Sequence, residues 1–201
     1  MSKVILLSQV PLPFSMIGSW TTLYKNYLNG KHQIDYIVCE QPNEFFENVQ
    51  YSLVPNNLRI KIEKKLKNNN YLGYLEAVEN VMNPDEKYII QIIDNFGIVK
   101  PLLDFLERKK LRSNCYLQFF YHGYPPFYGN FESRWFFEVI DEMVLLTNDS
   151  YIEHKKSYTI LPTRFSVLHN GIDTSKFHPL SLQMKEKMKE GKGVTGKKVF
   201  V

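Results

Sequence analysis

Short apolar runs alternate along this chain with longer segments in which apolar residues recur every three or four positions. Runs of the first kind are typical of buried strands, and segments of the second kind are typical of amphipathic helices. The expected strands span 4–7, 34–39, 88–93, 116–121, 143–147 and 165–169. The expected helices span 18–28, 58–68, 71–82 and 98–110, whereas the stretch 41–57, rich in Pro and Asn, is expected to be irregular.

Strands that alternate with helices at this spacing predict βαβ units and therefore a parallel sheet. The strands are nearly continuous apolar runs, as expected when helices cover both faces of the sheet. We therefore predict an α/β fold with a doubly wound, Rossmann-like parallel sheet over residues 1–178. Residues 179–201 are interpreted as a linker with a short helix, followed by the first strand of a further domain at 197–201.

The charge balance is mild, with 25 Lys and Arg against 21 Asp and Glu, a net charge of +4. This excess is far from the strong basic stripe of a nucleic-acid-binding protein, so no nucleic-acid partner is expected. Residues 1–100 hold ten basic and ten acidic residues, so the whole excess lies in 101–201. The excess indicates a solvated surface or, alternatively, attraction to a phosphate-bearing substrate or an anionic membrane surface.

Both cysteines, Cys39 and Cys115, lie in strand-like runs and are expected to be buried thiols, since no neighbouring Cys or His offers a metal site. No apolar run approaches the length of a membrane-spanning helix. The first residues also lack the apolar core and cleavage site of a secretory signal. We therefore expect a cytoplasmic protein, with contact to the inner face of a membrane as a peripheral protein left open.

Ligands of doubly wound folds bind beyond the carboxyl ends of the strands, so the loops there are the candidate sites. Gly18 and Ser19 follow the first strand and begin the first helix, where free N–H groups and the helix dipole favour a phosphate. An ordinary helix cap is the alternative. The loop has one glycine and therefore lacks the dinucleotide-binding fingerprint.

Two further loops carry polar side chains. Asp94 and Asn95 follow the strand at 88–93 and either cap the next helix or face a polar acceptor. His122, Gly123 and Tyr124 follow the strand at 116–121. A histidine in this position is able to exchange hydrogen bonds with a sugar hydroxyl or a phosphate, although a lone histidine is more often structural.

The most specific pattern is Asn-Gly-Ile-Asp-Thr-Ser-Lys-Phe-His-Pro at 170–179. Asn170 and Gly171 favour a tight turn, and Asp173 is placed to cap the turn that follows. This segment resembles the interdomain segment N-G-[IV]-D-x-x-x-F-x-P of group 1 retaining glycosyltransferases of the GT-B fold, family GT4. The resemblance extends over the whole chain, and residues 116–123 are its second-best match.

The resemblance implies roles for the residues above. His122 looks like the family's histidine beside the acceptor and the transferred sugar, and the loop at Gly18 and Ser19 looks like the loop near the donor diphosphate. Asp94, Asn95, Gly123 and Tyr124 would then bind the acceptor. Asn170, Gly171 and Asp173 would form the hinge to a donor-binding domain, which would begin near residue 197 and carry the family's paired glutamates.

By this resemblance the full protein transfers a sugar, with retention, from a nucleotide sugar to a glycan or glycolipid acceptor. The nucleotide sugar is a substrate, and no cofactor is expected. No Asp-x-Asp triplet occurs in the chain, which favours a mechanism without a metal. Two alternatives stay open: a nucleotide-sugar epimerase of the same architecture, and a non-catalytic, flavodoxin-like binding domain.

Overall fold

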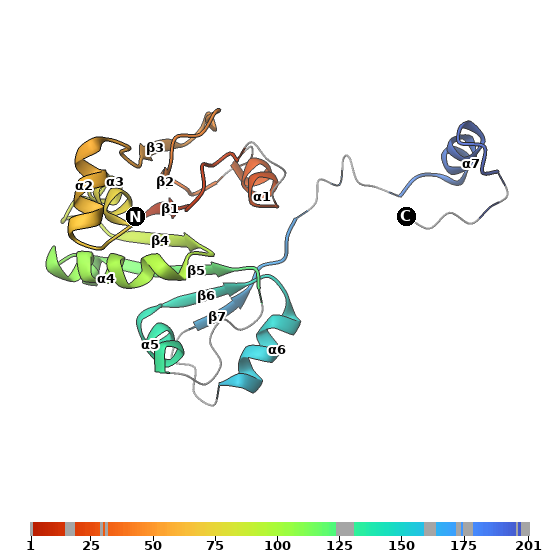
Figure 1. The fold of residues 1–201 in the computed structure, drawn as a ribbon. Coiled ribbons are helices and arrows are strands. Elements are labelled where there is room, and N and C mark those ends of the chain that lie inside the picture. The colour runs from red at the N-terminus through yellow and green to blue at the C-terminus, as the bar shows by residue number, and fades with distance from the viewer. Residues whose placement is uncertain are drawn as a thin grey trace. The chain divides into compact units, whose positions relative to one another are not determined.

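The computed structural model describes residues 2–14, 19–28, 30, 32–123, 131–158, 164–171, 174, 179–195 and 197. Seven strands form one sheet in which every pair is parallel: β1 (Lys3–Leu7), β2 (Tyr36–Cys39), β3 (Gln50–Leu53), β4 (Tyr88–Ile93), β5 (Cys115–Tyr121), β6 (Glu142–Leu145) and β7 (Arg164–Val167). The strand order is β3-β2-β1-β4-β5-β6-β7 (Figure 1). This order confirms the predicted doubly wound α/β fold.

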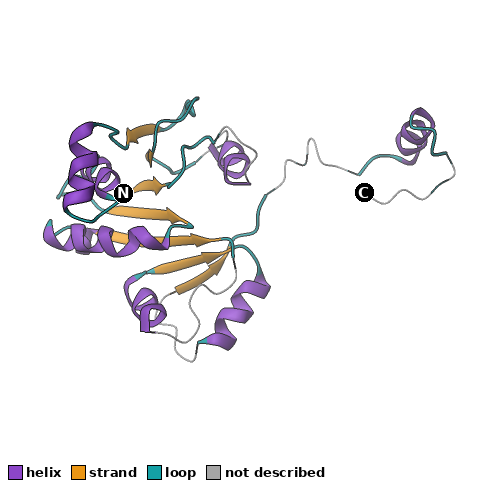
Figure 2. Ribbon diagram, viewed as in Figure 1, coloured by secondary structure: helices purple, strands orange, loops and turns teal. Residues whose placement is uncertain are grey.

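Helices connect the strands and flank the sheet (Figure 2). They are α1 (Ser19–Leu28), α2 (Leu58–Leu66), α3 (Leu72–Glu79), α4 (Val99–Arg108), α5 (Phe131–Val139) and α6 (Asn148–Ser157), and a further helix, α7 (Leu182–Gly191), follows the last strand. Short 3₁₀ turns, η1 (Phe96–Ile98) and η2 (Arg112–Asn114), precede α4 and β5. The predicted helices are thus found with ends shifted by a few residues, as is usual where helix termini fray.

One expectation about the fold was wrong. The stretch 41–57 contains β3, a strand that pairs with β2 alone at the edge of the sheet. Of its four residues, Ser52 is buried and Gln50 is exposed. An edge strand needs no continuous apolar run because only part of it is covered, so the apolar pattern that reveals central strands is missing here.

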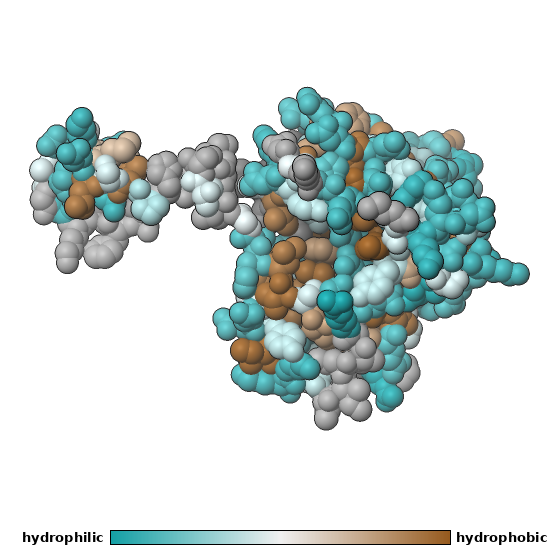
Figure 3. All heavy atoms as spheres, turned by 180° about the vertical axis from the view of Figure 1, so that it is seen from behind, coloured by the Kyte–Doolittle hydropathy of each residue, from teal (hydrophilic) through white to brown (hydrophobic). Residues whose placement is uncertain are grey.

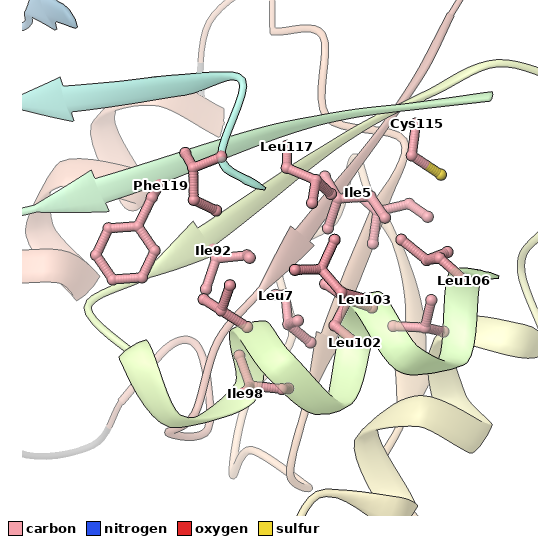
Figure 4. Packing of buried hydrophobic residues seen from close by; sticks show 14 of the residues in the cluster. Ile5, Leu7, Ile92, Ile98, Leu102, Leu103, Leu106, Cys115, Leu117 and Phe119 are labelled. Atoms are coloured by element: carbon pink, nitrogen blue, oxygen red, sulfur yellow. The ribbon is translucent and has the colours of Figure 1, made fainter. Parts of the chain in front are cut away.

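The main core lies between the sheet and α4 (Figure 4). Leu102, Leu103 and Leu106 of α4 are buried at helical spacing and face β1, β4 and β5. A second, smaller cluster packs α1 against β1 and β2 through Tyr24 and Leu28. Helices thus bury apolar side chains on both faces of the sheet, which is what fixes the parallel arrangement.

A polar row crosses the sheet away from that core. The side chains of Gln91 on β4, Gln118 on β5 and Glu142 on β6 occupy paired positions. Gln91 Nε2 donates to Gln118 Oε1 at 3.0 Å, and Gln118 Nε2 donates to Glu142 Oε2 at 2.7 Å. Ser166 Oγ of β7 completes the row by donating to Glu142 Oε1. These bonds satisfy polar groups within strands that are otherwise apolar.

Both cysteines are buried free thiols, as predicted. Burial raises the pKa of Cys39 and of Cys115 to about 11, so neither is a thiolate at neutral pH.

Some large hydrophobic side chains are exposed at the surface of the protein, and they lie in several places on the face shown in Figure 3.

The chain divides into two compact units, residues 1–170 and residues 171–201. The first contains the whole sheet, and the second contains α7. The division falls inside the segment 170–179 that we predicted to be a hinge, although the assignment of a further domain after residue 178 stays a prediction. Within the described residues, no helix has the length and apolar character needed to cross a bilayer.

Candidate functional site

The strand order reverses between β1 and β4, which are neighbours at the centre of the sheet. In such sheets the carboxyl ends of the strands beside this point form the usual ligand site. Asp94 follows β4 directly, and His122 follows the neighbouring strand β5. The topology therefore brings two of the predicted site residues together from positions 28 apart in the sequence.

Asp94 is held in an unusual backbone conformation, with a positive φ of 44°. Asp and Asn tolerate this region better than other non-glycine residues. Its N–H still donates to the carbonyl of Phe120 at 2.9 Å, so the ladder between the two strands continues to this residue. The side chain is consequently turned toward the next strand instead of capping the following helix.

The carboxylate of Asp94 binds His122 at two points. Its Oδ1 accepts a hydrogen bond from the His122 N–H at 3.0 Å, and its Oδ2 lies 3.5 Å from Nδ1 of the imidazole. The His122 side chain is 18% exposed. The backbone hydrogen bond joins the two residues, and the second contact places the Asp94 carboxylate beside the imidazole.

Gly123 is required by the tyrosine that precedes His122. A Cβ atom on Gly123 would lie 2.4 Å from Oη of Tyr121, closer than any real contact. The Gly123 carbonyl accepts a hydrogen bond from Ser150 Oγ of α6 at 3.1 Å. His122 and Gly123 thus form one wall of an open pocket of about 300 Å³, whose other wall is the first turn of α6 with Asp149 and Ser150.

Asn95 lies inside the fold and not at the surface of this pocket. It is only 5% exposed, and its Oδ1 accepts a hydrogen bond from Tyr71 Oη at 3.4 Å. Gly97 leaves the space for that hydroxyl, since a Cβ there would lie 2.1 Å from it. The structure therefore gives Asn95 neither a capping role nor a surface for an acceptor, and its contacts hold the turn that presents Asp94.

The remaining predicted residues are placed only in part. Asn170 closes the first unit and lines, with His169 and His122, a shallow hollow at the ends of β5, β6 and β7. Gly171 opens the second unit. Ser19 is the first residue of α1. Gly18, Tyr124 and Asp173 lie outside the described residues.

Sequence reasoning missed a larger pocket, about 450 Å³, between the loop after β1 and the loop after β2. Phe45, half exposed, packs its ring edge against Tyr51 at 4.8 Å between centroids. Carboxylates and a lysine share the lining, namely Glu44, Glu47 and Lys25. The signal was the pair Phe45-Phe46 inside a polar loop that follows a strand, which the assignment of 41–57 as irregular left unused.

His154 of α6 was also missed, and it is structural. Its side chain is fully buried among the rings of Tyr121, Phe137 and Phe165. Its Nδ1 lies 2.7 Å from the Ser150 carbonyl, which fixes the proton on that nitrogen. Burial lowers the pKa of His154 because the charged ring loses its hydration.

The described residues contain no cluster of side chains that could hold a metal ion. Among residues 2–14, 19–28, 30, 32–123, 131–158, 164–171, 174, 179–195 and 197, no group of three or more His, Cys, Asp or Glu side chains converges on one point. The pair Asp94 and His122 supplies at most two ligands.

No protein-family model and no curated protein matches the chain. Among solved structures, the chain is similar to the N-terminal domain of trehalose-6-phosphate phosphatase from Candida albicans, with a TM-score of 0.55 and 14% sequence identity. The match covers 96% of this chain and 55% of that one, so the chain spans little more than half of the solved protein. At this identity the likeness establishes the Rossmann-like fold and nothing finer.

Proposed function

We propose that this chain is the acceptor-side part of a glycosyltransferase that transfers a sugar from a nucleotide sugar to a glycan or glycolipid. The observation that carries the proposal is the pair of His122 and Asp94 at the carboxyl ends of β4 and β5. A histidine beside a carboxylate at this edge of the sheet is able to exchange hydrogen bonds with a sugar hydroxyl.

Two further observations support it. The segment 170–179 resembles the interdomain segment of GT4 enzymes, and the two compact units divide at its first residue pair. The solved domain of similar fold comes from an enzyme named for a phosphorylated sugar, trehalose-6-phosphate. The likeness to that domain is one of fold, so the sugar chemistry is carried by the site and by the segment.

In this proposal the chain positions the acceptor and the transferred sugar, and positioning and stabilisation of the leaving diphosphate are the two means by which such a reaction is accelerated. His122 contacts the sugar, and Asp94 is a positioning residue that acts through the imidazole. In the same proposal Gly123 and Tyr124 bind the acceptor, and Gly18 and Ser19 bind the leaving diphosphate. No metal or cofactor takes part, and the nucleotide sugar is bound chiefly by a second domain.

The test uses full-length protein incubated with candidate nucleotide sugars and glycan or glycolipid acceptors. Release of free nucleotide together with an extended acceptor is the expected result. An isomerised donor without nucleotide release would instead identify an epimerase, and the absence of both reactions across a broad donor panel would contradict the proposal. The 201-residue chain alone is expected to be inactive.

Asp94→Asn sharpens the assignment of roles. Asparagine keeps the positive φ and the size of the side chain but removes the negative charge beside the imidazole. We expect kcat to fall by at least about tenfold with little change in KM or melting temperature. Asp104→Asn, which removes an exposed carboxylate paired with Lys100 on α4, is the matched control and leaves kcat unchanged.

A further inference from the structure

Helix α2 presents three large apolar side chains to solvent. Leu58, Ile62 and Leu66 are 73%, 50% and 80% exposed, and their spacing of four residues places them on one side of the helix. Isolated exposed apolar residues are ordinary, but here all three lie along one side of a nine-residue helix. We refer to these three side chains as the α2 row.

The α2 row faces outward because the opposite side of the helix is anchored. Ile60 is 2% exposed, and the absence of a side chain on Gly73 lets α3 approach it closely. Arg59 makes two hydrogen bonds to the Glu76 carboxylate on α3, at 2.7 and 2.5 Å. The side chain of Asn57 caps the first turn. These contacts fix the rotation of α2, so the row cannot turn inward without breaking them.

Positive charge surrounds the α2 row. Residues 58–67 hold five basic residues and one acidic residue, which leaves five basic and nine acidic residues in the rest of 1–100. Lys61 and Lys65 are exposed and flank the row by helical position. Within the described part of the chain, no ion pair involves Lys61, Lys64 or Lys65, whereas Arg59 and Lys67 share Glu63.

We propose that α2 docks this domain on an anionic phospholipid surface, with the α2 row entering the headgroup boundary and the flanking lysines contacting lipid phosphates. Apolar side chains flanked by lysines are the pattern of helices that lie in the membrane interface. Each lysine held near an anionic bilayer adds to the binding, and its contribution falls with salt. The proposal is independent of the sugar-transfer chemistry at the carboxyl edge of the sheet.

The unit 171–201 supplies a matched comparison within the same chain. Helix α7 also exposes three apolar residues, Leu182, Met184 and Met188, at 80%, 53% and 57%. It is less positive, since residues 182–192, the helix with its C-cap, hold four lysines against two glutamates, whereas residues 58–67 hold five basic residues against one glutamate. The higher density of positive charge therefore favours α2 over α7 as the docking surface.

Sedimentation of the 201-residue chain with lipid vesicles tests the proposal. The chain is expected to bind vesicles of phosphatidylcholine mixed with phosphatidylglycerol, and to be released by raised salt. The triple variant L58S/I62S/L66S and the double variant K61Q/K65Q should each weaken binding by about tenfold or more. Both keep the circular dichroism spectrum and melting temperature of the parent, because all five side chains are exposed.

The matched triple variant L182S/M184S/M188S should bind as the parent does. Three results would overturn the proposal: no binding of the parent chain to anionic vesicles, equal binding to pure phosphatidylcholine, or loss of binding in the α7 variant with binding retained in the α2 variants. The last two would show that α2 is an ordinary exposed helix or a contact surface for another protein.

Discussion

Two histidines close to the end of β5 have opposite environments. His122 lies at the rim of an open pocket with a carboxylate beside its imidazole, whereas His154 is enclosed by aromatic rings and has the Ser150 carbonyl beside its Nδ1. The two are linked through Ser150, whose carbonyl lies beside His154 and whose hydroxyl donates to Gly123. The site edge thus rests on a dry aromatic cluster, and we expect the edge to set activity and the cluster to set stability.

The largest expected effect is on the aromatic cluster. Phe137 is 2% exposed and its ring lies 4.6 Å from that of Tyr158 and 5.8 Å from that of Phe165. Phe137→Ala should lower the free energy of unfolding by about 3–5 kcal/mol, because it leaves a cavity among packed rings. Denaturant unfolding of the 201-residue chain measures this. A loss below about 1 kcal/mol would mean that the cluster does not support the fold.

His122→Ala probes the other side of the comparison. In the full-length enzyme we expect kcat/KM to fall by about 10²-fold, or about 2.7 kcal/mol of transition-state stabilisation. The melting temperature should change little, since the imidazole lies at the rim of the pocket and is not packed in the core. Steady-state kinetics and thermal melts of the same preparation give both quantities.

The opposite outcome has a distinct signature. If His122→Ala melts early while its folded fraction works normally, His122 is a structural residue, and the proposed site is misplaced. His169→Ala is a useful companion, because this histidine follows β7 at the same edge and its Nδ1 contacts only the Leu146 carbonyl among the bonds described. We expect a smaller effect on kcat/KM from this second substitution.

The sequence was informative wherever burial imposed a pattern. The central strands could be placed from apolar runs such as 88–93, which matches β4 residue for residue. The edge strand β3 was missed because its sequence, Gln-Tyr-Ser-Leu, carries no such run, whereas the other edge strand, β7, was placed at 165–169. The net charge of zero over residues 1–100 likewise concealed the positive charge of α2. The acidic residues that balance this charge in the total lie elsewhere in the sequence.

Contacts between residues far apart in the chain could not be predicted from the sequence. Asp94 and His122 were both singled out, but their pairing depends on β4 and β5 being neighbours and on the positive φ of Asp94. Asn95 and Asp94 looked equivalent in the sequence. In the structure the Asn95 side chain is buried and accepts a hydrogen bond from Tyr71, whereas the Asp94 side chain contacts His122. His154 gave no signal because a single histidine in a polar helix resembles any surface histidine.

Gly123→Ala tests whether Tyr121 ties the two regions together. The added Cβ would lie 2.4 Å from Oη and 2.6 Å from Cζ of Tyr121, so the ring must move against its neighbours. We expect a loss of about 1–3 kcal/mol in unfolding free energy. Gly171→Ala is the control, because no atom of the described residues lies within 4 Å of the added Cβ, and it should change stability by less than about 0.5 kcal/mol.

The double variant Gly123→Ala with Tyr121→Leu distinguishes this clash from a general intolerance of the turn. Leucine lacks the atoms that the new Cβ would meet, so the two substitutions together should cost less than the sum of their separate costs. Strict additivity of the two unfolding free energies would show that Gly123 is needed for another reason.

The smallest expected effect is the pH dependence contributed by His154. Burial lowers its pKa in the folded protein below the ordinary value near 6.5. At higher pH the ring is neutral in both states and its titration contributes nothing. As the pH falls below that ordinary value, His154 becomes protonated in the unfolded chain but stays neutral in the folded chain. The free energy of unfolding therefore decreases until the pH reaches the pKa of the folded state.

One such site gives a slope of at most about 1.4 kcal/mol per pH unit. Unfolding curves of the parent and of His154→Gln, taken between pH 7.5 and pH 5, should therefore diverge in slope, with the parent losing more stability on acidification than the variant. The variant is less stable at every pH because it disturbs the ring cluster, but the difference in slope isolates the titration. Parallel profiles would show that His154 takes up a proton without cost, and hence that the aromatic cluster is not as dry as its contacts with Tyr121, Phe137 and Phe165 indicate.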